Sequence, residues 1–415
     1  MIMFITKNTF FRQIILLAGG TAAAQLINLA ILPILTRIYT PSDFGIFAVM
    51  SASVAIVNVF LSMRYENAII AVKTDADALV GTFSVMVLAC VVSLALVFFW
   101  SVIGFGVELN TKYLLIGYIV IVFSLVTCFT QALYFLCNRL SNYHVMTNGR
   151  IYGALSLAVL SISWGYFLHN FWGLLLGSLL GVSINFLYLW CSLGETKNKL
   201  FTPNKKVVKY LKDNIRFPKY LVVSSLIDRS GSQGYLILLT KLYGEGVAGS
   251  LSLYNRVAGF PSVLVGTAIG DVFKRNASEQ LRKYGECKRL VLLTAAGLLV
   301  IAIIPFFLLL FFGPHIFEVV FGSEWRQAGE FARFLAPVFL LGFIVSPISS
   351  LIYLEENQKY DLYVQSILLI FLILGLGFSL FFSKVYFAII AYAISYFFKY
   401  CFELKVCWRI ASGER

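Results

Sequence analysis

The chain alternates between long apolar runs and short polar breaks. The runs last about twenty residues or more, which is the length of helix that crosses the ~30 Å hydrocarbon core of a bilayer. Strands of a membrane barrel would give shorter segments of alternating polarity, so the runs predict helices. We expect twelve of them, at about residues 13–36, 44–70, 79–105, 113–137, 149–168, 171–193, 218–240, 247–272, 289–312, 331–354, 362–383 and 385–407.

One of the breaks occurs twice. The sequence Leu-Thr-Arg-Ile-Tyr at Leu35–Tyr39 recurs 204 positions later as Leu-Thr-Lys-Leu-Tyr at Leu239–Tyr243, and Gly249 follows the second copy as Gly45 follows the first. This offset is close to half of the 415 residues, so we infer a tandem duplication.

The duplication predicts the domain organisation and the symmetry. The expected fold class is all-α integral membrane, with an N-terminal six-helix lobe at 1–193, a basic cytoplasmic linker at 194–217 and a C-terminal six-helix lobe at 218–415. Six is an even number, so the second lobe enters the bilayer from the same side as the first. The two lobes should therefore be related by a pseudo-two-fold axis along the membrane normal.

Composition supports a membrane protein and excludes a secreted one. Hydrophobic residues make up 60% of the chain and charged residues 13%, with a mean hydropathy of +0.85, which is too little polar surface for a soluble protein. Lys7 and Arg12 followed by Ala22-Ala23-Ala24 could be taken for a signal peptide. The apolar run continues past these alanines and belongs to the first repeat, so cleavage there would cut into the repeat.

The basic residues of the loops predict the orientation in the membrane. Assigning the loops to alternate sides places 23 Lys and Arg residues on the side of the N-terminus and 6 on the other. Basic residues accumulate on the cytoplasmic side, so both termini should be cytoplasmic. The net charge of +13 is then explained by anionic lipid neighbours, without a nucleic-acid partner.

Several kinds of chemistry find no support in the sequence. The seven cysteines form no Cys-x-x-Cys, and the three histidines lie far apart, so neither a disulfide framework nor a metal site is predicted. No Gly-x-x-x-x-Gly-Lys-Ser/Thr is present. We therefore expect no cofactor, no ATP hydrolysis and no enzymatic activity within the chain.

Two arginines are expected near the membrane midplane. At ~1.5 Å per residue, Arg229 lies about 16 Å from Pro218, and Arg256 lies about 15 Å beyond Gly246. An arginine that faces lipid at this depth costs at least ~2.5 kcal/mol, so both should face the bundle interior or a hydrated cavity. Asp228 leaves two alternatives open: a structural ion pair, formed more naturally with Arg256 than with its neighbour Arg229, or a cavity in which an arginine contacts an anionic substrate.

Polar groups in the first half complete the candidate site. Arg64 and Glu66 are expected near the cytoplasmic mouth, either as an interfacial ion pair or as substrate contacts. Gln25 and Asn28 share one face of the first helix with Thr21, which suits either hydrogen bonding between helices or a hydrated lumen. The candidate substrate-binding residues are Arg229, Arg256, Asp228, Arg64, Glu66, Gln25 and Asn28.

The first repeat resembles a known family. It contains Leu-Pro-x-Leu-Thr-Arg-x-Tyr-x-Pro-x-Asp-Phe-Gly from Leu32, followed by Arg-Tyr-Glu-x-Ala-Ile from Arg64. This pattern covers about forty residues and is similar to the N-terminal repeat of Wzx-type polysaccharide and O-antigen flippases, in the multidrug/oligosaccharidyl-lipid/polysaccharide exporter superfamily. The second half lacks the Arg-Tyr-Glu motif and has Ala268-Ile269-Gly270 in its place, so only the first-half motif carries over.

The resemblance implies a two-lobed transporter. Such a protein moves undecaprenyl-diphosphate-linked oligosaccharide, of O-antigen or capsule type, from the cytoplasmic to the periplasmic leaflet by alternating access. It implies a monomer that works beside other polysaccharide-assembly membrane proteins. Related flippases of lipid-linked precursors keep cavity arginines, including one on the eighth helix, where Arg256 lies.

Two other classes stay open. A cation-coupled multidrug exporter would share the superfamily architecture but should carry acidic cavity residues, and Asp228 is the only acid clearly expected at the midplane. A membrane-embedded polysaccharide polymerase or ligase would need a sizeable loop on the far side, and the far-side loops are short.

The charge pattern makes a direct prediction about topology. Reporters fused after Leu200 and after Tyr284 should both lie in the cytoplasm, because each follows a helix that returns to the basic side. A reporter at either position that lies in the periplasm would overturn the orientation.

Overall fold

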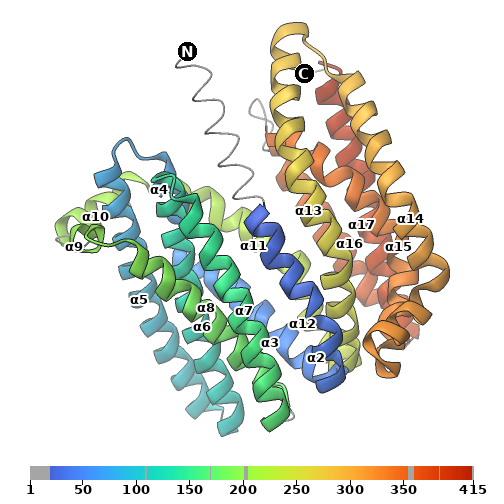
Figure 1. The fold of residues 1–415 in the computed structure, drawn as a ribbon, viewed down its shortest axis with the longest axis horizontal. Helices are drawn as coiled ribbons and strands as arrows, with labels where there is room; N and C mark the ends of the chain where they lie inside the picture. Colours follow the sequence, from blue (N-terminus) through green and yellow to red (C-terminus); the bar gives the residue numbers. More distant parts are fainter. Residues whose placement is uncertain are drawn as a thin grey trace. The chain divides into compact units, whose positions relative to one another are not determined.

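The computed structural model describes residues 19–107, 110–168, 170–200, 204–353, 359–382 and 384–413. Every regular element among these residues is helical and none is a strand, as the apolar pattern predicted (Figure 1). The described residues form two compact units. Unit 1 contains the residues before Leu32 together with Val49–Arg229, and unit 2 contains Leu32–Ala48 together with the residues from Ser230 onward.

These units group the chain by contact and therefore differ from the proposed lobes in two places. The segment Leu32–Ala48 comes from the first repeat but packs within unit 2, and the segments 194–200 and 204–229 beyond the first lobe pack within unit 1. The lobes 1–193 and 218–415 remain our proposal for the limits of the duplication.

Unit 1 is a helical bundle around an apolar core. The core is built on Leu61, Leu133, Leu136 and Leu189, all fully buried. The helices that lie wholly in unit 1 are α4 (Glu66–Ala71), α5 (Asp75–Gly106), α6 (Thr111–Arg139), α7 (Tyr143–Leu168), α8 (Trp172–Ser192), α9 (Thr196–Leu200), α10 (Asn204–Asp213), the π-helix η1 (Pro218–Val222) and α11 (Val223–Arg229). The helix α3 (Pro41–Ser62) contributes its second part to unit 1.

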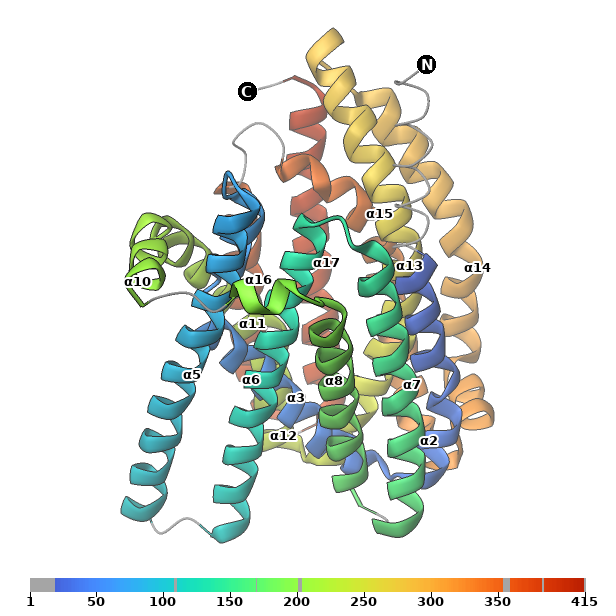
Figure 2. The ribbon, with the colours of Figure 1, turned by 60° about the vertical axis from the view of Figure 1, so that its left-hand side comes forward.

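Small residues let two helices of unit 1 pack closely. A Cβ added at Gly153 of α7 would lie 3.1 Å from the Gly181 carbonyl oxygen of α8, and one added at Gly181 would lie 2.9 Å from the Gly153 oxygen. Glycines at facing positions allow the backbones of membrane helices to approach. The two helices accordingly lie side by side (Figure 2).

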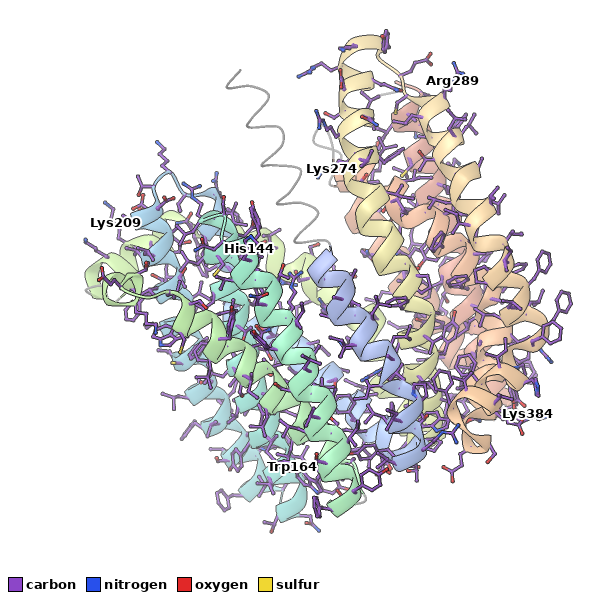
Figure 3. All side chains as sticks on the ribbon, viewed as in Figure 1. His144, Trp164, Lys209, Lys274, Arg289 and Lys384 are labelled. Atoms are coloured by element: carbon purple, nitrogen blue, oxygen red, sulfur yellow. The ribbon has the colours of Figure 1, made fainter. Side chains whose placement is uncertain are left out.

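Unit 2 is the second bundle. It contains α2 (Leu32–Ile38), η2 (Ser230–Gly234), α12 (Tyr235–Tyr243), α13 (Glu245–Tyr284), α14 (Lys288–Phe321), η3 (Ser323–Trp325), α15 (Arg326–Ile348), η4 (Ser349–Tyr353), α16 (Lys359–Phe382) and α17 (Val385–Ala411). Arg289 lies near one end of this bundle and Lys384 near the other, and Lys274 lies between them in the half nearer Arg289 (Figure 3).

Each of the twelve predicted segments contains helix within the described part of the chain. Ten helices there are long and apolar enough to cross a membrane, so the chain is a multi-pass membrane protein. Two of the twelve predicted segments are not among the ten. The segment 218–240 is divided into η1, α11, η2 and α12, and the segment 247–272 lies within α13. The predicted loop at 273–289 is wrong in its first part, because α13 continues to Tyr284 before Gly285 ends it with φ 76°.

The repeated break marks the start of a long helix in both halves. In the first copy, the Thr40 hydroxyl accepts from the Asp43 backbone N–H at 3.2 Å, while Asp43 Oδ2 accepts from the Thr40 backbone N–H at 3.1 Å. This reciprocal capping box, with Pro41 at the first helical position, starts α3. In the second copy, Gly244 with φ 94° occupies the equivalent position and α13 begins at Glu245.

The two glycines of the repeat face each other inside unit 2. A Cβ added at Gly45 would overlap the Glu245 carbonyl oxygen, and one added at Gly249 would overlap the Pro41 carbonyl oxygen and lie 3.0 Å from the Gly45 nitrogen. The first turns of α3 and α13 are therefore in backbone contact, and each copy of the repeat supplies one of the glycines.

An aromatic contact holds the hairpin Leu32–Ala48 to the rest of unit 2. The Trp325 indole N–H donates to the Thr36 carbonyl oxygen at 3.0 Å. The Trp325 ring meets the Phe44 ring edge-on, with centroids 4.9 Å apart, and both side chains are almost fully buried. Buried aromatic pairs of this geometry contribute beyond the burial of their area, so the hairpin Leu32–Ala48 is an integral part of unit 2.

The glycine crossing predicts a large effect of one methyl group. Gly45→Ala or Gly249→Ala should destabilise the protein by about 1–3 kcal/mol or more, because the added Cβ must displace backbone that cannot rotate away. Gly297→Ala is the matched control, since Gly297 lies within α14 with nothing within 4 Å of its added Cβ. Thermal unfolding in detergent should show a lowered Tm for the first two variants and an unchanged or raised Tm for the control. Equal Tm values for all three would contradict the close crossing.

Candidate functional site

The predicted helix 44–70 is interrupted at the Arg-Tyr-Glu motif. The helix α3 ends at Ser62, Met63 and Arg64 have φ values of 45° and 60°, and α4 begins at Glu66. Left-handed backbone costs roughly 1–2 kcal/mol for each residue other than glycine. Two such residues in succession at one position indicate strain that surrounding contacts must hold.

Local hydrogen bonds hold this break. The Arg64 backbone N–H donates to Ser62 Oγ at 3.2 Å, and Asn67 Nδ2 donates to the Arg64 carbonyl oxygen at 3.1 Å. The break gives the Arg64 side chain a direction that a continuous helix would not. Its Nε donates to Ser225 Oγ of α11 at 2.8 Å, and its Nη1 donates to Glu66 Oε1 at 3.4 Å.

Glu66 is a buried carboxylate with one oxygen unused. Its side chain is 1% exposed, and Oε2 has no hydrogen-bond partner among the described residues. A buried charge needs a nearby opposite charge to be tolerated, and Arg64 supplies it. The two residues therefore form an ion pair within unit 1, which is one of the two alternatives that the sequence left open.

A cavity of about 300 Å³ lies inside unit 1, next to this pair. We call it the arginine cavity. Its wall comes from α3, α6, α8, α11 and Arg64, and apolar side chains provide part of it. The polar side chains of its lining are Ser51, Asn58, Arg64, Thr127, Gln131 and Arg229.

Arg229 enters the arginine cavity with spare hydrogen-bonding capacity. Its Nε lies 4.0 Å from Asp228 Oδ2, and the two side chains are 39% and 50% exposed. That distance is too long for a hydrogen bond, and Nε has no hydrogen-bond partner in the part of the chain that the structure describes. Arg229 can therefore donate to a ligand without breaking a strong contact.

The structure brings together two arginines that the sequence placed at different depths. The expectation that Arg64 lies near the cytoplasmic mouth assumed that the helix 44–70 is continuous, and the estimate for Arg229 assumed a continuous helix from Pro218. The break at Met63–Arg64 and the π-helix η1 remove both assumptions. Arg64 and Arg229 consequently line one cavity.

Arg256 lies in unit 2, on α13. Its guanidinium carbon is 5.8 Å from the Phe44 ring centroid and 5.1 Å from that of Phe47, and its side chain is exposed. Cation–π contacts of this length hold a guanidinium over an aromatic face. The salt bridge seen for Asp228 is the weak one with Arg229, its neighbour in the chain.

Gln25 and Asn28 lie on the helix that precedes α2 and are partly buried. Neither lines the arginine cavity. Asn28 Oδ1 has no hydrogen-bond partner among the described residues, and two turns earlier Thr21 Oγ1 accepts from Arg150. This face of the helix therefore takes part in contacts within unit 1.

Sequence reasoning missed several residues of the arginine cavity, chiefly Asn58, Thr127, Gln131 and the Ser225 that holds Arg64. A usable signal existed for two of them. Asn58 is the only amide in α3, and Gln131 lies within the apolar run of α6. Amides are expensive in the bilayer interior unless they face a partner or a cavity, as Arg229 was argued to do.

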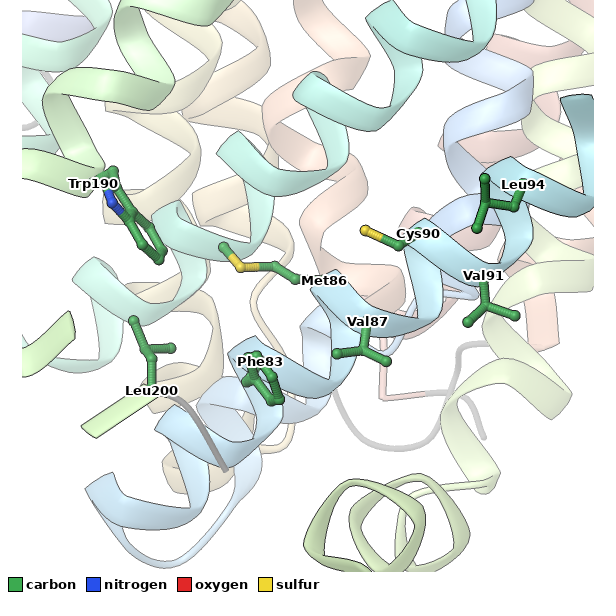
Figure 4. A pocket seen from close by; sticks show the side chains of 8 residues that line it. All are labelled: Phe83, Met86, Val87, Cys90, Val91, Leu94, Trp190 and Leu200. Atoms are coloured by element: carbon green, nitrogen blue, oxygen red, sulfur yellow. The ribbon is translucent and has the colours of Figure 1, made fainter. Parts of the chain in front are cut away.

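A second pocket, of about 270 Å³, lies between α5, α8 and α9 (Figure 4). Its lining is hydrocarbon, aromatic ring and sulfur, including Met86, Cys90 and Trp190. No charged or amide side chain lines it. Of these two pockets, only the arginine cavity can hold an anionic headgroup.

Comparison with known proteins gives the family and the fold. A family profile described as "Polysaccharide biosynthesis protein" matches residues 34–330. The fold is similar to that of the lipid II flippase MurJ in an inward closed conformation, with a TM-score of 0.66, 15% identity, and 96% of this chain and 90% of that chain covered.

Two multidrug transporters have a similar fold. An inward-facing MATE family transporter of the MOP superfamily gives a TM-score of 0.59 at 12% identity, with 95% of each chain covered. The Vibrio cholerae MATE transporter VcmN gives 0.59 at 10% identity, again with 95% of each chain covered. Comparison with curated protein sequences gives no match.

The helical structure and these comparisons confirm the resemblance seen in the first repeat. At identities this low, the solved structures establish the two-lobed, twelve-helix fold. The family profile covers more than two thirds of the 415 residues, and the chain belongs to the polysaccharide biosynthesis protein family.

Proposed function

We propose that this protein is a flippase for undecaprenyl-diphosphate-linked oligosaccharide. It would move repeat units of O-antigen or capsule type from the cytoplasmic to the periplasmic leaflet of the inner membrane by alternating access. The observation that carries the proposal is that Arg64 and Arg229 line one cavity inside unit 1. Membership of a polysaccharide biosynthesis family supports the saccharide part of the substrate.

The chemistry of the arginine cavity fits a diphosphate. Guanidinium groups bind phosphate oxygens in a bidentate manner, and such charge-assisted bonds are about twice as strong as neutral ones. Both arginines have long ion pairs, of 3.4 Å from Arg64 to Glu66 and 4.0 Å from Arg229 to Asp228. Each guanidinium group therefore keeps N–H donors that can bind a phosphate oxygen. A diphosphate could thus join both arginines without removing a short ion pair.

An exporter of organic cations fits this cavity less well. Both charged side chains of its lining are arginines, and neither Glu66 nor Asp228 is part of that lining. A positively charged wall repels a cationic drug and attracts an anion. The fold shared with MATE transporters therefore does not extend, in our proposal, to their type of substrate.

We propose that the protein is a transporter and not an enzyme. The fold that it shares with a lipid II flippase and with MATE transporters supports this proposal. We further propose that Arg256, Gln25 and Asn28 contact the substrate along its path, that Glu66 and Asp228 position the cavity arginines, and that the protein is a monomer which works beside other polysaccharide-assembly proteins.

We also propose that α10 contacts anionic lipid headgroups. This helix docks on unit 1 through buried Val207 and Tyr210, and the Tyr65 hydroxyl donates to the Leu211 carbonyl oxygen at 3.0 Å. Its exposed side carries Lys206, Lys209 and Lys212, of which Figure 3 labels Lys209. A cytoplasmic location of the reporter after Leu200 would put these lysines at the more negative leaflet.

Substitution of the cavity arginines tests the proposed function. In a strain whose surface polysaccharide depends on this protein, Arg64→Ala or Arg229→Ala should lower surface polysaccharide at least about tenfold, because each removes charge-assisted hydrogen bonds of about 1.5–3 kcal/mol. Arg229→Lys should restore only part, since an ammonium binds phosphate at a single point. Surface polysaccharide would be measured on extracts normalised to the amount of protein in the membrane.

The matched control is Arg326→Ala. Arg326 is 61% exposed and pairs with Glu318 on the surface of unit 2, so its loss should leave surface polysaccharide unchanged. Wild-type amounts of polysaccharide in both Arg64→Ala and Arg229→Ala would contradict the proposal.

A further inference from the structure

Two amide side chains meet in the wall of the arginine cavity. Asn58 of α3 donates from Nδ2 to Gln131 Oε1 of α6 at 3.0 Å. Both residues line the same cavity as Arg64 and Arg229. They come from helices of unit 1 that are far apart in sequence, so the pair joins two sides of the wall.

The pair leaves hydrogen-bonding capacity unused. An amide has two N–H donors and an oxygen that accepts two hydrogen bonds. The bond between the two side chains uses one donor of Asn58 and one acceptor of Gln131. Asn58 Oδ1 is buried and has no hydrogen-bond partner among the described residues. A buried acceptor without a hydrogen bond costs free energy. A ligand that donates a hydrogen bond to Asn58 Oδ1 would remove that cost.

A diphosphate cannot be that donor. Its oxygens are acceptors that suit the guanidinium groups, whereas Asn58 Oδ1 needs an O–H or N–H. The ligand of the arginine cavity should therefore carry hydroxyl or amide hydrogens beside its phosphates. A hexose attached to the diphosphate supplies hydroxyl hydrogens.

The position of the Asn58–Gln131 pair in the cavity wall agrees with a sugar joined to the diphosphate. Asn58 lies in the last turns of α3, which ends at Ser62, and Arg64 follows in the break after that helix. On α6, Phe123, Thr127 and Gln131 follow one another at i, i+4 and i+8, and all three line the cavity. The wall thus offers an aromatic ring, a hydroxyl and an amide on α6 and a second amide on α3, which together suit a sugar ring.

We propose that Asn58 and Gln131 form a sugar-reading site, in which they hydrogen-bond the saccharide unit joined directly to the diphosphate while Arg64 and Arg229 hold the phosphates. This proposal rests on the proposed function and specifies which residues distinguish a glycosylated carrier lipid from the bare one. It gives the amide pair a role in substrate selection, because a carrier without sugar leaves Asn58 Oδ1 unsatisfied.

The test compares two lipids on the full-length protein in nanodiscs. Binding is measured for undecaprenyl diphosphate and for undecaprenyl diphosphate that carries a single hexose. The wild type should bind the hexose-bearing lipid more tightly than the bare lipid. Asn58→Leu should weaken binding of the hexose-bearing lipid about fivefold, the equivalent of one hydrogen bond of about 1 kcal/mol, and should leave the bare lipid unchanged. Gln131→Leu should do the same, which covers the case in which one variant fails to fold.

Ser53→Ala is the matched control. Ser53 also lies on α3, but its hydroxyl donates to the Val49 carbonyl oxygen of its own helix and it does not line the cavity, so neither affinity should change. An equal loss for both lipids, or no loss for either, would overturn the sugar-reading site while leaving the arginine site intact. Failure of the wild type to bind either lipid would overturn the proposed function itself, and with it this inference.

Discussion

The contact between Gly45 and Gly249 is the constraint on which the rest of the structure depends. It brings the first turns of α3 and α13 into backbone contact, with no room for a single Cβ on either side. Because the two glycines are equivalent positions of an internal repeat, the two halves of the duplication meet at matching points. The contact, together with the bond from Trp325 to Thr36, draws the hairpin Leu32–Ala48 into unit 2, while α3 continues into unit 1.

The second determinant is the break in α3 at Met63–Arg64. A continuous helix would be cheaper, since two residues other than glycine adopt left-handed backbone there. Ser62, Asn67, Glu66 and Ser225 hold the break, and its result is a guanidinium directed beside the arginine cavity. Strained backbone often marks functional positions. In this chain the strained residue is itself one of the two cations that the proposed substrate requires.

The sequence predicted the presence of the helices well, because the length of an apolar run is a local property. The sequence indicated Arg64 and Arg229 as candidate substrate-binding residues, because charged residues are rare within apolar runs. The sequence did not predict that Arg64 and Arg229 share a cavity. That placement depends on the break at Met63 and on the π-helix η1, and no simple sequence pattern predicts either feature. Asn58 and Gln131 were missed because their pairing depends on two helices meeting, with 73 positions between them in the chain.

The central claim is that the cavity arginines hold the diphosphate of a lipid-linked saccharide during its passage across the membrane. The most direct measurement is leaflet exchange of a fluorescent undecaprenyl-diphosphate-linked saccharide in proteoliposomes, followed by a membrane-impermeant quencher. The account predicts rapid exchange with the wild-type protein and exchange at the rate of empty liposomes with the Arg64→Ala, Arg229→Ala double variant. Equal rates for the wild type and the double variant would contradict it.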